Sequence, residues 1–208
     1  MRTRPIESRH VLFLAITILA IITTVAYPWA QAWHIIHTRT IAGVSPVTWT
    51  LSFAVFASWA CFAMSIQYWE LLAVNLACMT GAVVVIISGT RGGWSIRWAA
   101  ISAVALAAIL TLLFVNVAAL AVLIAVGGIA VRVPQIFALL RSPSIVGVSV
   151  VSLAASVITV VLWSMLAISK DLGTVLISNI VSFIGSVLLV AILLARRGGM
   201  PPVLGRGH

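Results

Sequence analysis

The sequence contains one segment twice, and this internal repeat limits the possible folds more than any other feature. Gly43-Val44-Ser45 recurs as Gly147-Val148-Ser149, 104 residues later. Four further matches keep that offset: Ser52 with Ser156, Trp59 with Trp163, Asn75 with Asn179, and Gly81 with Gly185. Pro28 matches Pro134 at an offset of 106, so two extra residues separate proline from glycine in the first copy. Matches held in register over this length indicate an internal duplication.

Composition shows where such a chain resides. Of its 208 residues, 63% are hydrophobic and only 7% are charged, whereas a soluble domain has about 25% charged residues. The sequence therefore predicts an integral membrane protein, with the lipid bilayer as a partner. The net charge of +9 comes from basic residues that stand singly or in pairs between apolar runs. This pattern is typical of the ends of membrane spans and argues against nucleic-acid binding.

The apolar runs predict an all-α membrane protein with seven transmembrane helices. Most of them approach the ~20 residues that cross a ~30 Å hydrocarbon core. The expected spans are 11–32, 46–67, 71–89, 98–115, 118–140, 148–169 and 172–195. We expect a polar loop from Gln31 to Ser45, and turns at Tyr68–Glu70, Asn116 and Lys170–Asp171.

The repeat divides the chain into two similar parts. The expected segments are an N-terminal tail (1–10), a first three-helix repeat (11–90), a loop and linker helix (91–117), a second three-helix repeat (118–196) and a disordered C-terminal tail (197–208). Each copy has three spans, an odd number, so two copies joined directly would cross the membrane in opposite directions. The unrepeated fourth span between them reverses the direction once more. The two copies are therefore expected to be parallel, and parallel-repeat transporters bind substrate near the membrane midplane.

Two tryptophan–asparagine pairs are the candidate binding residues. Trp59 lies eight residues before Gln67, at the turn between the second and third spans, and Asn75 lies eight residues after it. Trp163 and Asn179 have the same spacing around the turn of the second copy. Eight residues correspond to ~12 Å of helix, close to the midplane. Aromatic faces and amides suit a neutral polyol such as a sugar; the alternative is that the four residues only pack and bond across helices.

The second copy, from Arg132-Val133-Pro134-Gln135-Ile136 through Gly147-Val148-Ser149, Trp163 and Asn179, resembles the PQ-loop/SWEET superfamily of transporters. The resemblance covers about residues 11–196. It implies two three-helix bundles joined by a linker helix, with the two tryptophans and two asparagines lining a sugar pocket. The first copy departs from the pattern, because Trp29 and not glutamine follows Pro28. Of the four hinge prolines of the family, Pro28 and Pro134 match, Pro46 lies near its expected place, and none lies near Val150.

The remaining candidate residues concern gating and the solute pathway. Pro28, Pro134 and Gln135 are candidate hinge or gating residues, because a proline removes a backbone hydrogen bond and favours a kink. Ser52, Ser156 and Arg132 are candidate pathway residues. Arg132 is costly at membrane depth, so it either lines the pathway or extends to the cytoplasmic surface.

These features predict a facilitative transporter of small neutral solutes, such as sugars, working by alternating access. A proton relay needs a buried ionisable side chain, but Glu7 lies in the tail, and Glu70 and Asp171 lie in turns. Two alternatives stay open: a proton-coupled amino-acid exporter, and a non-transporting receptor or scaffold. Homo-oligomerisation also stays open.

Nothing in the sequence predicts an enzyme or a cofactor. No set of nucleophile, base and acid can be assembled from the residues. Cys61 and Cys78 lie in apolar runs and are interpreted as small core residues. His34 and His37 are spaced to share one helix face, but no cysteine or acid accompanies them, so a metal site is not expected.

The distribution of basic residues predicts the orientation in the cell membrane. Seven spans put Arg2, Arg4, Arg9 and Lys170 on the N-terminal side and the other eight basic residues on the opposite side. The excess places the C-terminus in the cytoplasm and the N-terminus outside. A fluorescent reporter fused after His208 should therefore be active, and a periplasmic phosphatase fused there should be silent. The reverse result would contradict both the orientation and the number of spans.

Overall fold

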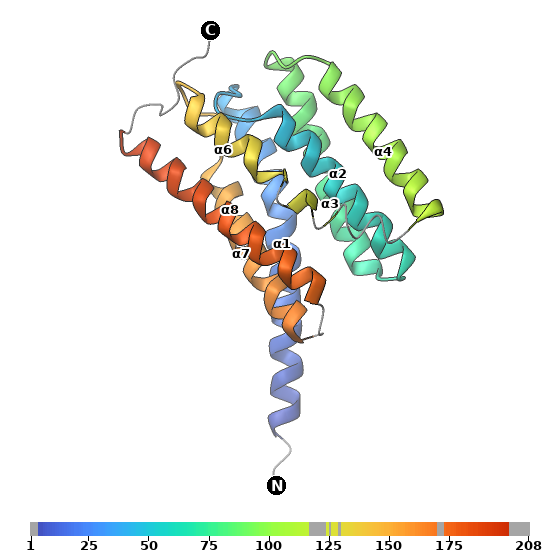
Figure 1. The fold of residues 1–208 in the computed structure, drawn as a ribbon. Helices are drawn as coiled ribbons and strands as arrows, with labels where there is room; N and C mark the ends of the chain where they lie inside the picture. The colour runs from blue at the N-terminus through green and yellow to red at the C-terminus, as the bar shows by residue number, and fades with distance from the viewer. Residues whose placement is uncertain (1–3, 117–123, 125, 129, 170–172, 200–208) are drawn as a thin grey trace.

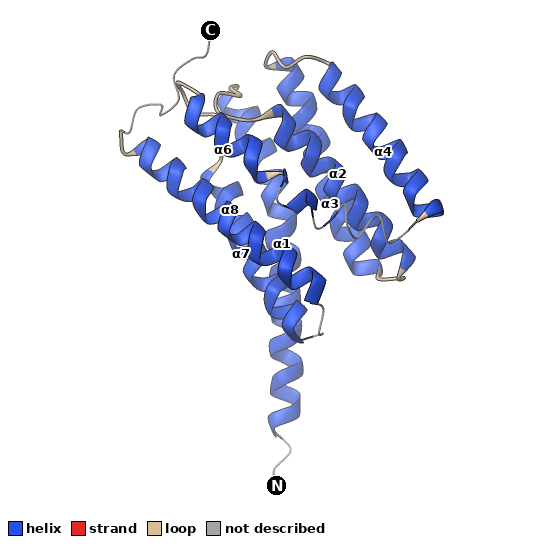
Figure 2. Cartoon of the chain, viewed as in Figure 1, coloured by secondary structure: helices blue, strands red, loops and turns tan. Residues whose placement is uncertain are grey.

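The computed structural model describes residues 4–116, 124, 126–128, 130–169 and 173–199. All regular structure in these ranges is helical (Figure 2). The helices are α1 (Arg4–Thr38), α2 (Pro46–Ser65), α3 (Trp69–Arg91), α4 (Arg97–Val115), α6 (Arg132–Arg141), α7 (Val150–Ser169) and α8 (Gly173–Arg197). The predicted all-α class is confirmed.

Five of these helices are long and apolar enough to cross a membrane: α1 from Val11, α2, α3, α7, and α8 from Leu176. They indicate an integral membrane protein. Helix α4, with 19 residues, coincides with the expected fourth span. The expected fifth span lies partly outside the described residues, and its final part is α6. With 10 residues, α6 alone is about 15 Å long, too short to span.

The helices form two groups on either side of α1 (Figure 1). Helix α3 packs against α1 and α2, and α4 covers α2. In the second group α8 packs against α6 and α7. Helix α1 also packs along α7, and α2 meets α6, so these two contacts join the groups. Helix α1 begins at one end of the bundle and α8 finishes at the other (Figure 1).

The repeated Gly-Val-Ser segment forms the turn that starts α2 and α7. The Ser45 hydroxyl accepts a hydrogen bond from the Thr48 amide (3.2 Å), and the Ser149 hydroxyl accepts one from the Ser152 amide (3.1 Å). Each serine therefore satisfies one of the free N–H groups at a helix start. The serine of the motif is explained by helix capping, and it does the same work in both copies.

The first candidate membrane span begins at Val11, as expected, but the expected end of that span is wrong. Helix α1 starts at Arg4, inside the expected tail, because Pro5 lies in the first turn, where a missing N–H costs little. It also continues to Thr38, through half of the expected loop 31–45. Polarity suggested a loop there, but Gln31 is buried and finds its hydrogen bonds inside the protein. Arg39 then leaves the helix with a φ of 52°.

The other predicted turns are close to the observed ones. Helix α2 ends at Ser65 and α3 begins at Trp69, so the turn is 66–68 and not Tyr68–Glu70. Gln67 makes that turn with a φ of 56°. Asn116 ends α4, as expected. Lys170–Asp171 and the tail beyond Gly199 lie outside the described residues.

The two proline positions differ in their surroundings. Pro28 is fully buried inside α1, ten residues before its end. Pro134 is the third residue of α6, and Val131 just before that helix keeps helical dihedral angles (φ −62°, ψ −33°) and donates to the Gly127 oxygen (3.0 Å). Because Pro134 has no N–H, it cannot bond back to the preceding turn.

The main apolar core lies toward the end of the bundle that carries the Gly-Val-Ser turns. It draws on α1, α2, α3, α6, α7 and α8 together; examples are Tyr27, Trp49, Val85, Leu139 and Leu189. Toward the opposite end a smaller cluster, Ala20 with Leu162 and Leu166, joins α1 to α7. Among the described residues, the larger of these two clusters therefore lies at the end with the Gly-Val-Ser turns.

Candidate functional site

Two glutamines hold the two copies of the repeat together. The Gln31 amide donates to the main-chain oxygen of Gly147 (2.7 Å), and its side-chain oxygen accepts from the Ser149 amide (3.0 Å). Gln135 makes the equivalent pair of bonds, to the Gly43 oxygen (2.8 Å) and from the Ser45 amide (3.0 Å). Each glutamine thus binds the Gly-Val-Ser turn of the other copy. We call these four bonds the glutamine bridges.

The two turns also touch each other directly. The Gly147 amide donates to the Ala42 oxygen (3.1 Å). A Cβ on Gly147 would lie 2.8 Å from the Ala42 nitrogen, and one on Gly43 would lie 3.0 Å from the Ile145 Cα. Gly43 has a φ of 81°, which also favours glycine. The glycine of the motif therefore permits close approach of the two main chains.

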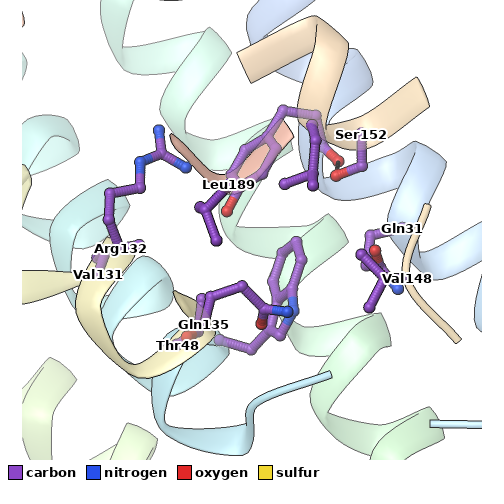
Figure 3. Close-up of a pocket in the computed structure, with 11 residues that line it drawn as sticks. Gln31, Thr48, Val131, Arg132, Gln135, Val148, Ser152 and Leu189 are labelled. Carbon is purple, nitrogen blue, oxygen red and sulfur yellow. Dashed lines mark hydrogen bonds between the residues drawn. The ribbon is translucent and has the colours of Figure 1, made fainter. Parts of the chain in front are cut away.

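A small buried cavity lies just inside the glutamine bridges (Figure 3). Its volume is about 10 Å³, room for about one water molecule. Four pairs of its lining residues are separated by the repeat offset of 104: Tyr27 with Val131, Gln31 with Gln135, Thr48 with Ser152, and Trp49 with Leu153. The cavity therefore lies where equivalent residues of the two copies face each other. Arg132, Val148 and Leu189 complete its lining.

The contacts also revise how the two copies correspond. Gln31 and Gln135 make equivalent bonds at an offset of 104 and not 106. A Cβ on Gly81 would meet Pro28 at 2.9 Å, and one on Gly185 would meet Arg132 at the same distance. Pro28 is therefore equivalent to Arg132, and its predicted match with Pro134 is wrong. The glutamine missing after Pro28 is present as Gln31, one helical turn further on.

The two predicted tryptophans are not on the wall of this cavity. Trp163 is partly buried and donates its indole N–H to the Thr24 hydroxyl of α1 (2.8 Å). Trp59 packs edge-on against Phe62, with ring centroids 6.0 Å apart. Trp163 thus lies at the contact between the two groups of helices, whereas the described ring contact of Trp59 is within α2.

The two predicted asparagines also lie away from the cavity. Asn75 is buried and donates to the Leu71 oxygen of its own helix (2.8 Å). The Asn179 amide nitrogen is buried without a hydrogen-bond partner. No hydrogen bond among the described residues joins either asparagine to a predicted tryptophan, so a binding site built from these four residues stays a prediction.

Of the other candidates, Gln135 and Arg132 line the cavity, and Ser52 and Ser156 do not. The Ser52 hydroxyl is buried without a partner, whereas the Ser156 hydroxyl donates to the Leu153 oxygen (2.8 Å). His34 contacts the Val146 oxygen (2.7 Å) and His37 the Trp33 oxygen (2.9 Å). Within the described residues no group of three or more His, Cys, Asp or Glu could hold a metal ion.

Sequence reasoning missed five polar or aromatic cavity residues: Tyr27, Gln31, Thr48, Trp49 and Ser152. The glutamine pair shares the offset of 104, so the repeat itself could have revealed it. The two prolines matched at 106 and concealed it. Tyr27 and Trp49 have no identical partner in the second copy, so no repeat signal marked them.

No protein-family model, curated protein or solved structure matches the chain.

The glutamine bridges predict matched losses of stability. Gln31→Ala and Gln135→Ala should each lower the free energy of unfolding by about 2–4 kcal/mol, because each leaves a buried carbonyl and a buried amide without partners. Thermal or denaturant unfolding in detergent measures this. Gln67→Ala is the control, since Gln67 is exposed in the α2–α3 turn and its truncation should cost less than about 0.5 kcal/mol. Unchanged stability in either bridge variant would show that its bonds do not form.

Proposed function

We propose that this chain is a facilitative transporter of small polar solutes in the cell membrane. The proposed arrangement is that of the SWEET/PQ-loop superfamily, in which two parallel three-helix halves, here with α4 as the linker, move about a central site. The observation that carries the proposal is the reciprocal pair of glutamine bridges above a cavity formed by equivalent residues. Each glutamine contacts the turn of the other copy in the same way. Reciprocal contacts of this kind are expected between two units related by a two-fold axis. A solute pathway between parallel repeats follows such an axis.

The helix packing supports the two halves. Helix α3 packs between α1 and α2, and α8 packs between α6 and α7. If α1 corresponds to α6 and α2 to α7, the contact of α1 with α7 should have a counterpart between α6 and α2. Both contacts are present. The helix equivalent to α1 would then be the fifth span, of which α6 is the last part.

The distribution of the core supports a closed gate at one end. The Gly-Val-Ser turns, the glutamine bridges and the main apolar core all lie there. With the predicted orientation this end faces the cytoplasm. Four hydrogen bonds of about 1 kcal/mol each hold the turns together.

Buried polar groups support a pathway between the halves. The Ser52 hydroxyl, the Arg132 Nε and the Asn179 amide nitrogen are buried without hydrogen-bond partners. Such groups are rare in native structures and costly in a membrane. They are expected where water or solute reaches them in another state of the protein. The sugar predicted from the tryptophan–asparagine pairs stays one candidate solute.

A reversible cross-link across the gate tests this function. His34 and Val146 belong to different halves and touch at the closed end. In a Cys61→Ala, Cys78→Ala background, the pair His34→Cys with Val146→Cys would be joined by a short thiol-specific cross-linker in liposomes. Counterflow of labelled sugars, amino acids and carboxylates is then measured. Cross-linking should stop exchange of whichever solute the uncross-linked protein carries, and reduction should restore it.

A pair within one half is the matched control. Ile41 and Gly92 touch at the same end but both belong to the first half. Cross-linking Ile41→Cys to Gly92→Cys should leave exchange nearly unchanged, because these positions move together. Exchange that continues after complete His34–Val146 cross-linking would exclude this gate. Failure to exchange any solute of the panel would reject the transporter.

A further inference from the structure

We propose that the transported solute is a small organic monoanion, a carboxylate, and that Arg132 is the counter-charge that binds it. This inference rests on the proposed function and names its substrate class. Its basis is the position of Arg132, a charged side chain at a depth in the membrane where charge is costly.

Arg132 lies at the depth of the membrane centre. Its side-chain stem packs on Gly185, where an added Cβ would meet the Arg132 Cγ at 2.9 Å. Gly185 is the central residue of the 25-residue α8, with twelve residues on either side. Twelve residues correspond to about 18 Å of helix, so neither membrane surface is close. An ionisable side chain at this depth is costly and usually functional.

The charge of Arg132 is not compensated by the described part of the protein. Its Nε is buried without a hydrogen-bond partner, and the one described interaction of its charged group is with the Tyr27 ring, whose centroid lies 5.6 Å from the guanidinium carbon. Glu70, the one acid whose side chain the structure describes, is exposed at the start of α3. Arg196 differs, because it is buried but binds the main-chain oxygens of Leu139 and Ser142 at the end of α6. Arg196 therefore holds the fold, whereas Arg132 has no such partner.

The cavity beside Arg132 offers further donors. Thr48 lines it with 3% of its surface exposed, and its hydroxyl has no partner. The hydroxyl of Ser152, the equivalent residue in the second copy, instead donates to the main-chain oxygen of Tyr27 (2.6 Å). Thr48 and Ser152 lie in the first turns of α2 and α7, and the start of a helix carries a partial positive charge. Free donors and positive potential together favour an anion.

The walls select the kind of anion. Trp49, Leu153 and Leu189 are apolar and suit a carbon skeleton. A planar guanidinium binds a carboxylate through two parallel hydrogen bonds. One arginine balances one negative charge, which favours a monocarboxylate over phosphate or a dicarboxylate. A cationic solute would be repelled. At about 10 Å³ the cavity is too small for the solute, so binding requires the halves to separate.

The repeat shows that this charge is specific to one half. Pro28 is the equivalent of Arg132 and packs on Gly81 as Arg132 packs on Gly185. A role in packing is thus met by an uncharged residue in the first half. In the second half, Arg132 makes the same kind of contact with Gly185 but also carries a guanidinium. Packing on the glycine therefore does not explain the charge.

Lactate is the probe that tests the proposal, with glucose and succinate as comparisons. Reconstituted protein should exchange labelled lactate by counterflow and should raise its unfolding temperature when lactate is added. Arg132→Gln should reduce lactate exchange at least tenfold and abolish the thermal shift, and Arg132→Lys should retain part of both. Arg141→Gln is the matched control, because Arg141 also lies on α6 over an aromatic ring, that of Phe137, but is exposed.

A second readout separates binding from structure. Without lactate, Arg132→Gln should unfold at the same temperature as the native protein or higher, because it removes a half-buried charge whose Nε has no hydrogen-bond partner. A large loss of stability would make Arg132 structural and overturn the proposal. Exchange of glucose without lactate would also overturn it and leave the transporter intact. If the protein exchanges none of the solutes, both the carboxylate proposal and the transporter proposal are rejected. Lactate exchange that is unaffected by Arg132→Gln would exclude Arg132 as the counter-charge.

Discussion

The structure depends on two glutamines that each satisfy the main chain of the opposite repeat. Loops cannot be buried between helices unless their amides and carbonyls are bonded. Gln31 and Gln135 supply those bonds to the two Gly-Val-Ser turns. The motif follows from this need: glycine allows the main chains to approach, valine is buried, and serine caps the next helix. The turns, the closed end and the cavity all follow from the same four hydrogen bonds.

Duplication explains the architecture, and departures from duplication point to the function. Most equivalent positions keep similar residues because they make similar contacts. The pair Pro28 and Arg132 differs in charge, and it lies beside the cavity at membrane depth. The pair Thr48 and Ser152 differs in hydrogen bonding, since only Ser152 has a partner. A two-fold framework with unequal polar groups on its axis can hold a solute that has two different ends.

The helical class, the membrane setting and most helix boundaries could be predicted from the sequence, because apolar length and span-end polarity determine them. The loop expected at 31–45 was half wrong, since polarity cannot distinguish a residue in water from one bonded inside the protein. Gln31 is that case. The tryptophan–asparagine ring was inferred from depth alone, and depth does not say which way a side chain points around its helix. Trp163 instead meets Thr24. The cavity needed tertiary contacts that no local pattern contains.

The central claim is that the two halves move against each other around the glutamine bridges. Distances between spin labels measure this most directly. Arg91 and Arg141 are exposed in different halves at the closed end, and Ile66 and Ser169 are exposed in different halves at the other. In liposomes, Gln31→Ala with Gln135→Ala should lengthen the Arg91–Arg141 distance and shorten the Ile66–Ser169 distance. If the folded double variant shows no change in either distance, the account is contradicted.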